Sequence, residues 1–305
     1  MGWTTRPLLR IVAALLLPLL VPWLITLALW ALPGDPAELI CPPGLCAGTE
    51  TLAASLHLDE GPLGFYSVWM SSAFQGDLGT SWRMIQGVPV AEEVWRSLPS
   101  TLGLVGLTSL GIVSFMILTA VGWLPRRADA VWRIAGVPPA VIGALLAAAW
   151  IMISFGASSY SGSAALLRLV AGALVLLVFD GTLSDAVSGT RQAFDAEWRQ
   201  RYVEVAVLRG ESALLNMLPN MLPALAGQLR GRILHLLSGS VAVEVVLGIE
   251  GLGDLLWAGT LSQDFSIVLG AAWAFAFMSG LLLLAQAILE LGVGLWVRRA
   301  PQGVA

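Results

Sequence analysis

The chemistry open to this chain is limited first by the residues that it lacks. A P-loop needs a lysine behind a glycine-rich turn, and all 16 basic residues of the sequence are arginine. The two histidines, His57 and His235, lie far apart, and neither a His-Glu-x-x-His nor a Gly-x-Ser-x-Gly motif occurs. We therefore expect no enzyme activity, no metal site and no cofactor in this chain, so that any ATP chemistry would belong to separate subunits.

A second set of residues carries charge or polarity inside segments that are otherwise apolar. Charge within a membrane is costly and by default indicates function. The sequence therefore offers candidates for lining a polar translocation path, namely Arg230, Arg232, His235 and Glu244. The simpler alternative is that the membrane boundary lies later in the segment and that the arginines extend to it. Glu290, late in the last apolar segment, is explained equally well by pairing with an arginine at the boundary.

The composition indicates which elements position these side chains. Hydrophobic residues make up 57% of the chain, charged residues only 12%, and the mean hydropathy is +0.81, whereas soluble proteins have about 25% charged residues. A helix needs about 20 apolar residues to cross a membrane. We therefore predict an all-α polytopic membrane protein with about six transmembrane helices, at residues 11–32, 101–124, 134–155, 166 to about 187, 222–247 and 267–297.

The distribution of arginine predicts the orientation of these helices. Cytoplasmic loops carry the excess of positive charge, and most arginines fall near the two ends of the chain and in the second and fourth connections. Both termini are therefore predicted to be cytoplasmic, in a multi-pass protein of the inner (plasma) membrane. The first apolar run is longer than the roughly 7–15 residues of a signal peptide, so we interpret it as an uncleaved helix. No basic face suggests a nucleic-acid partner.

Three regions follow from this topology: an N-terminal transmembrane helix (1–32), an external region (33–98) of short helices, and a core transmembrane domain (99–305). The external region contains Cys41 and Cys46. An oxidising compartment would permit a disulfide between them, and the alternative is two free thiols in a proline-constrained turn.

One long cytoplasmic connection, at about residues 188–222, is the place where a soluble partner would dock. Acidic residues favour a helix N-terminus, so Asp195 and Glu197 are expected to begin a helix. Gly210 is expected to end or bend it, and Pro219 and Pro223 to interrupt the approach to the fifth span. The plain alternative is an ordinary amphipathic helix on the membrane surface.

Residues 202–223 of this connection resemble the coupling loop of ABC-importer permeases. The pattern is E-A-A, three residues, Gly, nine residues, I-x-L-P, and its spacing is kept on Glu204, Val205, Ala206, Gly210, Asn220, Leu222 and Pro223. Further blocks, at residues 32–36, 75–82, 88–90, 98–102 and 236–270, are similar to the dipeptide/oligopeptide/nickel permeases of binding-protein-dependent ABC transporters. The chain departs from them at Val205 and Asn220, and it lacks their basic run before Gly210.

The resemblance implies an ABC type I importer permease fold. It also implies a path for peptides or a related small solute such as a nickel chelate, and an ATPase-coupling set comprising Glu204, Val205, Ala206, Arg209, Gly210, Leu222 and Pro223. The implied partners are a second homologous permease subunit, two ABC ATPase subunits that hold ATP and magnesium, and an external solute-binding protein. Two alternatives stay open, a secondary transporter or channel not driven by ATP, and a non-transporting structural subunit.

Overall fold

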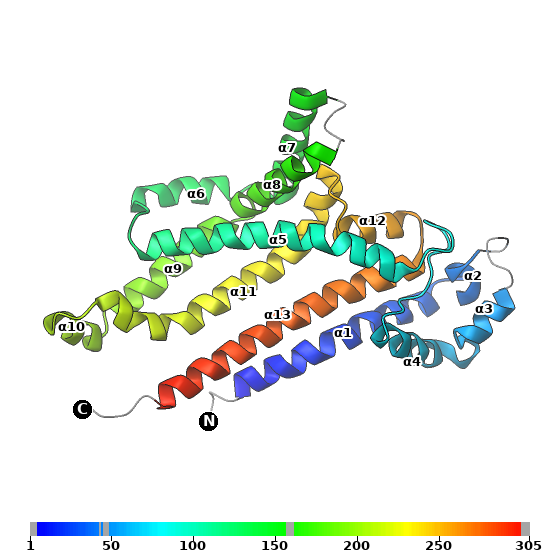
Figure 1. Ribbon diagram of the computed structural model, residues 1–305, viewed down its shortest axis with the longest axis horizontal. Coiled ribbons are helices and arrows are strands. Elements are labelled where there is room, and N and C mark those ends of the chain that lie inside the picture. Colours follow the sequence, from blue (N-terminus) through cyan, green and yellow to red (C-terminus); the bar gives the residue numbers. More distant parts are fainter. Residues whose placement is uncertain (1–4, 43, 45–48, 157–161, 300–305) are drawn as a thin grey trace. The chain divides into compact units, whose positions relative to one another are not determined.

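The computed structural model describes residues 5–42, 44, 49–156 and 162–299. This part of the chain consists of helices and their connections, with one isolated β-bridge between Thr80 and Pro89 (Figure 1). Two compact units divide the chain. The larger unit comprises residues 1–12, 104–247 and 282–305, and the smaller unit comprises residues 13–103 and 248–281.

Three helices contain apolar stretches long enough to cross a membrane: α1 (Thr5–Ala31), α5 (Val90–Ala120) and α13 (Phe265–Arg299). Three further spans are possible only as bent helix pairs. The pairs are α6 (Asp129–Ala135) with α7 (Ala140–Phe155), α8 (Gly162–Val178) with α9 (Thr182–Trp198), and α11 (Ala213–Leu247) with α12 (Leu252–Leu261). Counted in this way, the described residues contain up to six spans, which matches the predicted number.

The third and fourth predicted spans are not single helices. The third bends by 82° between α6 and α7, and the fourth by 49° between α8 and α9. Pro138 and Pro139 lie between α6 and α7, and they lack the backbone N–H that would be needed to continue α6. Asp180 and Gly181 have positive φ angles of 54° and 71°, which a right-handed helix does not accommodate. The two breaks are joined by a hydrogen bond of 3.2 Å from the Asp180 N–H to the Pro138 carbonyl.

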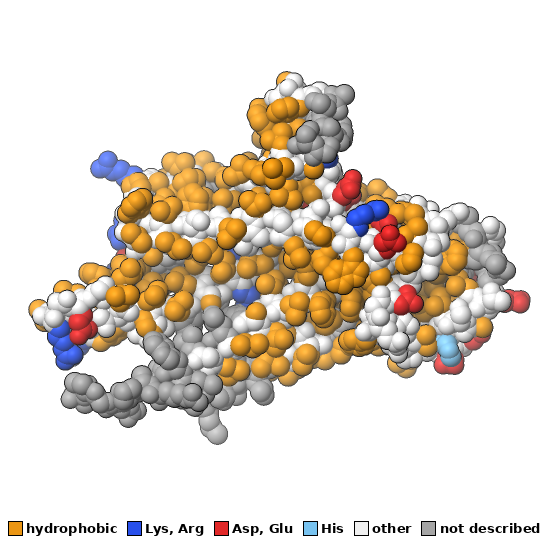
Figure 2. All heavy atoms as spheres, in the orientation of Figure 1, with side chains coloured by type: hydrophobic (Ala, Val, Ile, Leu, Met, Phe, Trp, Pro, Cys, Tyr) orange, Lys and Arg blue, Asp and Glu red, His pale blue; other side chains and the backbone are white. Residues whose placement is uncertain are grey.

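In the larger unit, α9 and α11 pack closely side by side. Gly189 on α9 has no side chain at the point where Gln228 of α11 approaches, because a Cβ there would lie 2.6 Å from the Gln228 Oε1. Many large side chains of this unit face outward, among them Leu110 (68% exposed) and Ile153 (86%). Figure 2 shows hydrophobic side chains over much of the visible surface, as a lipid-facing surface requires.

The smaller unit contains the short helices that the sequence predicts for its external region: α2 (Pro36–Ile40), α3 (Thr49–Ser55), η1 (Leu58–Glu60) and α4 (Gly61–Phe74). α5 begins at Val90, eleven residues before the predicted span, because Glu92 and Glu93 in its first turn favour a helix N-terminus. Cys41 is fully buried and disulfide-bonded. Cys46, its predicted partner, lies outside the described residues.

Candidate functional site

The predicted docking connection forms a compact tip in the larger unit, made by the end of α9, by α10 (Arg201–Leu208) and by the start of α11 (Figure 1). We call residues 193–222 the tip. Its core is Val203 of α10 with Met217 and Met221 of α11, all at most 3% exposed. Ala193 and Phe194 of α9 pack against this cluster, so that one hydrophobic core joins α10 to both neighbouring helices.

Polar contacts reinforce the tip. The Tyr202 hydroxyl donates to the Glu197 carboxylate at 2.6 Å and accepts from the Asn220 side-chain amide at 3.0 Å. Burial and, next, the hydrogen bond to Glu197 raise the pKa of Tyr202 above its ordinary value. The phenol therefore stays protonated at neutral pH and remains a donor, which links the last turn of α9 to α10 and α11.

Gly210 ends α10, as predicted. Its φ angle is +77°, which glycine adopts without the steric cost that a side chain would bring. The following N–H, of Glu211, turns back to the Ala206 carbonyl at 2.9 Å, a six-residue closure typical of helix C-termini. No heavy atom lies within 4 Å of a Cβ placed at Gly210, so this side of the turn is open to a partner.

The outer face of α10, defined as Glu204, Val205 and Leu208, points away from the core of the tip. Val203 and Ala206 are buried, whereas Val205 is 44% and Leu208 80% exposed, and Glu204 is exposed as well. Three residues spaced at i, i+1 and i+4 share one side of a helix. The face thus presents two apolar side chains and one carboxylate on a rigidly held helix.

The remaining predicted coupling residues lie in the turn after α10 and on α11. Arg209 is exposed at the C-cap of α10, and Leu222 is 43% exposed on α11. Pro223 lies within the bounds of α11, and its side chain is outside the described part. The structure therefore brings Glu204, Val205, Arg209 and Gly210 together on α10, whereas Ala206 is buried beneath them and does not present its side chain to a partner.

Two details of the predicted connection were wrong. Asp195 and Glu197 do not begin a helix, because α9 starts at Thr182, just after the Asp180–Gly181 break, and ends at Trp198. Their carboxylates instead pair with Arg126, at 3.1 Å, and with the Tyr202 hydroxyl. Pro219 and Pro223 do not interrupt the chain either, since α11 continues from Ala213 to Leu247. The burial of Met217 and Met221 holds this turn in place.

The four predicted path residues all lie on α11. Arg232 forms an ion pair with Asp185 of α9, with 2.8 Å between Nη1 and Oδ2. Arg230 is half-buried, His235 is exposed and Glu244 is fully buried, while the side chain of Glu290 lies outside the described part. The sequence did not indicate Asp185 as a site residue, and its pairing with Arg232 was not predictable because the two residues are 47 positions apart.

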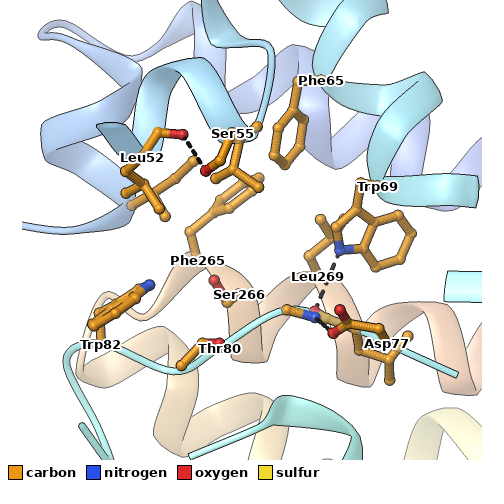
Figure 3. Close-up of a pocket in the computed structure, with 14 residues that line it drawn as sticks. Leu52, Ser55, Phe65, Trp69, Asp77, Thr80, Trp82, Phe265, Ser266 and Leu269 are labelled. Carbon is orange, nitrogen blue, oxygen red and sulfur yellow. Dashed lines mark hydrogen bonds between the residues drawn. The ribbon is translucent and has the colours of Figure 1, made fainter. Parts of the chain in front are cut away.

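The smaller unit contains a pocket that the sequence did not indicate, with a volume of about 220 Å³. Figure 3 shows aromatic side chains on several sides of it, with Asp77, Thr80 and Ser266 along one wall. Trp69 is fixed by a hydrogen bond of 3.3 Å to the Leu78 carbonyl, and the Asp77 carboxylate accepts from the Gly79 N–H at 2.9 Å. Among the described residues, no three His, Cys, Asp or Glu side chains are grouped as metal ligands.

The sequence itself identifies the family. Residues 91–293 match the binding-protein-dependent transport system inner membrane components. The chain belongs to this family. This permease is therefore the membrane subunit of an ABC importer, as its coupling-loop pattern predicted, and a transport component rather than an enzyme.

Curated relatives match this permease over most of their length. A Brucella abortus permease provisionally named for peptide transport is 28% identical over 300 residues, which cover 88% of this chain and 91% of that protein. The glutathione transport system permease protein GsiC of Escherichia coli K12 is 29% identical over 266 residues, which cover 82% and 84% of the two chains. These relatives span both units of the permease.

Proposed function

We propose that this permease forms, with a second homologous permease subunit, the membrane path of an importer for peptides or a related small solute. Two separate ABC ATPase subunits bind ATP and magnesium, and an external solute-binding protein delivers the solute. The chain itself carries the path and the coupling helix. The distribution of arginine supports an orientation in which both termini and the tip lie in the cytoplasm.

The observation that carries this proposal is the outer face of α10. An exposed leucine and valine beside a carboxylate, on a helix clamped by its own buried core, are suited to insertion into a groove of a soluble partner. Gly210 provides open space next to this face. ATPase subunits are the soluble partners that the family of importers requires on the cytoplasmic side.

The same packing explains how movement would pass into the membrane. Val203 of α10, Phe194 of α9 and Met217 of α11 belong to one hydrophobic cluster, and close-packed interiors transmit displacement. A partner that pulls on α10 therefore moves α9 and α11 together. Both helices continue into bent pairs long enough to span the membrane, which supports alternating access by rocking of these helices.

The proposed solute class rests on the relatives. One is named for peptide transport and another for glutathione transport, and the blocks of residues 75–82 and 236–270 are similar to those of peptide permeases. The short, weakly charged segment after Gly210 departs from that group. We propose that coupling is kept despite this departure, because Glu204 and Leu208 remain exposed on the outer face of α10.

The test is purification of the tagged permease from its native membrane, with mass spectrometry of the copurifying chains and an ATPase assay. Leu208→Asp and Val205→Asp place a charge on the outer face of α10 and do not touch the tip core. We expect both variants to lose the ATPase subunits and the associated activity. A double variant that retained them would refute the docking role of α10.

Val121→Asp is the matched control. Val121 is 55% exposed in the connection after α5, so the change has the same chemistry and a similar exposure to Val205→Asp. We expect this control to keep its ATPase subunits. A permease that arrives alone even as the wild type would contradict the ATPase partnership itself.

A further inference from the structure

Two helices of the larger unit, α9 and α11, hold an ion pair between them. Asp185 lies one turn before Gly189 on α9, and Arg232 lies one turn after Gln228 on α11, so the two helices run antiparallel with these positions in register. The charged atoms are 2.8 Å apart, with the Asp185 side chain 54% and that of Arg232 27% exposed. The ion pair is therefore formed, and its Asp185 side chain is still more than half exposed.

The position of Arg232 along α11 places it within the membrane. α11 has 35 residues, or about 52 Å at about 1.5 Å per residue, and Arg232 lies about 28 Å from the start of the helix by the same rise. The part of α11 that belongs to the possible spanning pair begins at Ala224, and Arg232 lies eight residues, or about 12 Å at the same rise, inside it. This favours an intramembrane position over an arginine at the boundary.

Polar residues recur at helical spacing along α9 and α11 near the ion pair, and two of those on α9 also line a pocket with Asp129 and Trp132 of α6. On α9 they are Asp185, Ser188 and Gln192, spaced at i, i+3 and i+7, and on α11 they are Gln228, Arg232 and His235, spaced at i, i+4 and i+7. Such spacings keep residues on one face of a helix. We call these six residues of the larger unit the polar stripe, and each of them is half-buried or exposed.

A stripe of this kind does not face lipid, because charges at membrane depth face the bundle interior or water. We propose that the polar stripe lines the water-filled translocation path of this permease, and that Asp185 and Arg232 bind the opposite charges of a zwitterionic solute such as a short peptide. This rests on the proposed transport function and narrows its solute class.

The chemistry of the pair selects for a zwitterion. A solute with an ammonium and a carboxylate exchanges the Asp185–Arg232 pair for two new pairs, and no charge is left unpaired. A solute with a single charge would leave one member of the pair without a partner, which costs free energy in a partly dehydrated path. The resting pair satisfies both charges when the path is empty.

The path is tested by cysteine accessibility in membrane fragments that contain the complete transport complex. Ser188→Cys and His235→Cys each place one thiol on the polar stripe, and the wild-type chain gives the background reaction. The probe is a charged, membrane-impermeant methanethiosulfonate. We expect both thiols to react, and reaction of both to slow when dialanine is added.

Leu110→Cys is the control on the apolar surface, since Leu110 is 68% exposed near the middle of α5, and it should not react. Variants are compared at equal amounts of copurified ATPase, which excludes misfolded chains. Stripe thiols as unreactive as the Leu110→Cys thiol would overturn the path and place the stripe in a dry interface with another subunit.

The solute class is tested by uptake of radiolabelled dialanine into proteoliposomes that contain the complex. Asp185→Asn and Arg232→Gln should each raise KM by at least about tenfold, which corresponds to the loss of one charge-assisted hydrogen bond. Glu60→Gln, which removes the 2.9 Å contact with His57 in the smaller unit, should leave KM unchanged.

An unchanged KM in both stripe variants would overturn the binding role. If the wild-type complex assembles with its ATPase subunits and does not take up dialanine, the zwitterion assignment is wrong, while thiol accessibility still decides the path. If no ATPase copurifies with the wild type, the proposed function fails first, and the two failures are thereby told apart.

Discussion

Ser81 and Asp264, which are 183 residues apart, are joined by a hydrogen bond of 2.7 Å from the serine hydroxyl to the aspartate carboxylate. The same oxygen accepts the backbone N–H groups of Trp82, Arg83 and Met84 at 2.9–3.1 Å. The other oxygen accepts the Ile267 N–H at 3.2 Å. This carboxylate is 1% exposed, and it fastens the loop before α5 to the connection between α12 and α13 in the smaller unit.

Asp264→Asn should lower the thermal unfolding midpoint of the purified permease. In the variant, an N–H donor can replace an oxygen that now accepts hydrogen bonds from Ser81 and from backbone N–H groups. Each hydrogen bond to a charged group that is lost costs about 1.5–3 kcal/mol. Tryptophan fluorescence measures the midpoint. The control is Asp77→Asn, because the exposed Asp77 carboxylate accepts the single N–H of Gly79 within the described part of the chain, and this variant should change the midpoint little. Equal shifts would contradict the role of Asp264 as a latch that joins the two connections.

The Asp264 latch should also weaken in acid. Burial alone would raise the pKa of Asp264, but the hydrogen bonds from Ser81 and from the backbone outweigh it, and the pKa is lowered from its ordinary value of 3.8. Because the folded pKa is below the unfolded one, the stabilisation is fully present above pH 3.8 and is lost as the pH falls through the folded pKa. The difference in midpoint between wild type and Asp264→Asn should therefore be constant near neutral pH and shrink on acidification below that value.

Met217→Ala should loosen the tip. Met217 is fully buried against Val203, and truncation of a buried methionine typically costs about 2–5 kcal/mol. Limited trypsin digestion reports the change, since the chain lacks lysine and Arg209 lies in the turn after α10. Faster cleavage there is expected for Met217→Ala, and unchanged cleavage for the neighbouring Leu218→Ala, which is 40% exposed. Equal rates in the two variants would mean that the cluster does not hold α10.

Gly136→Ala should reduce the amount of folded permease in the membrane. A Cβ at Gly136 would lie 2.8 Å from the Gly181 Cα. The connection between α6 and α7 would therefore have to move away from the connection between α8 and α9. Gly106 on α5 has open space around it, and Gly106→Ala should be neutral or stabilising by up to about 1 kcal/mol. Size-exclusion profiles in detergent compare the two variants, and a monodisperse Gly136→Ala peak at wild-type yield would show that the contact is not needed.

The sequence by itself determined the membrane character of this protein, its helical fold class and its family. Long apolar runs have one stable solution in lipid, the helix, and the spacing from Glu204 to Gly210 is a local property of the chain. The turn at Gly210 was predictable for the same reason, because its cost depends on the residue's own φ angle.

Only the tertiary structure decided what joins distant residues. The pairing of Asp185 with Arg232, the latch from Ser81 to Asp264 and the burial of Ala206 depend on which helices pack together, and no local pattern encodes that. The same holds for α11, where the sequence predicted interruption at Pro219 and Pro223. Burial of Met217 and Met221 against α10 offsets the local cost of proline, because tertiary packing outweighs intrinsic helix propensity.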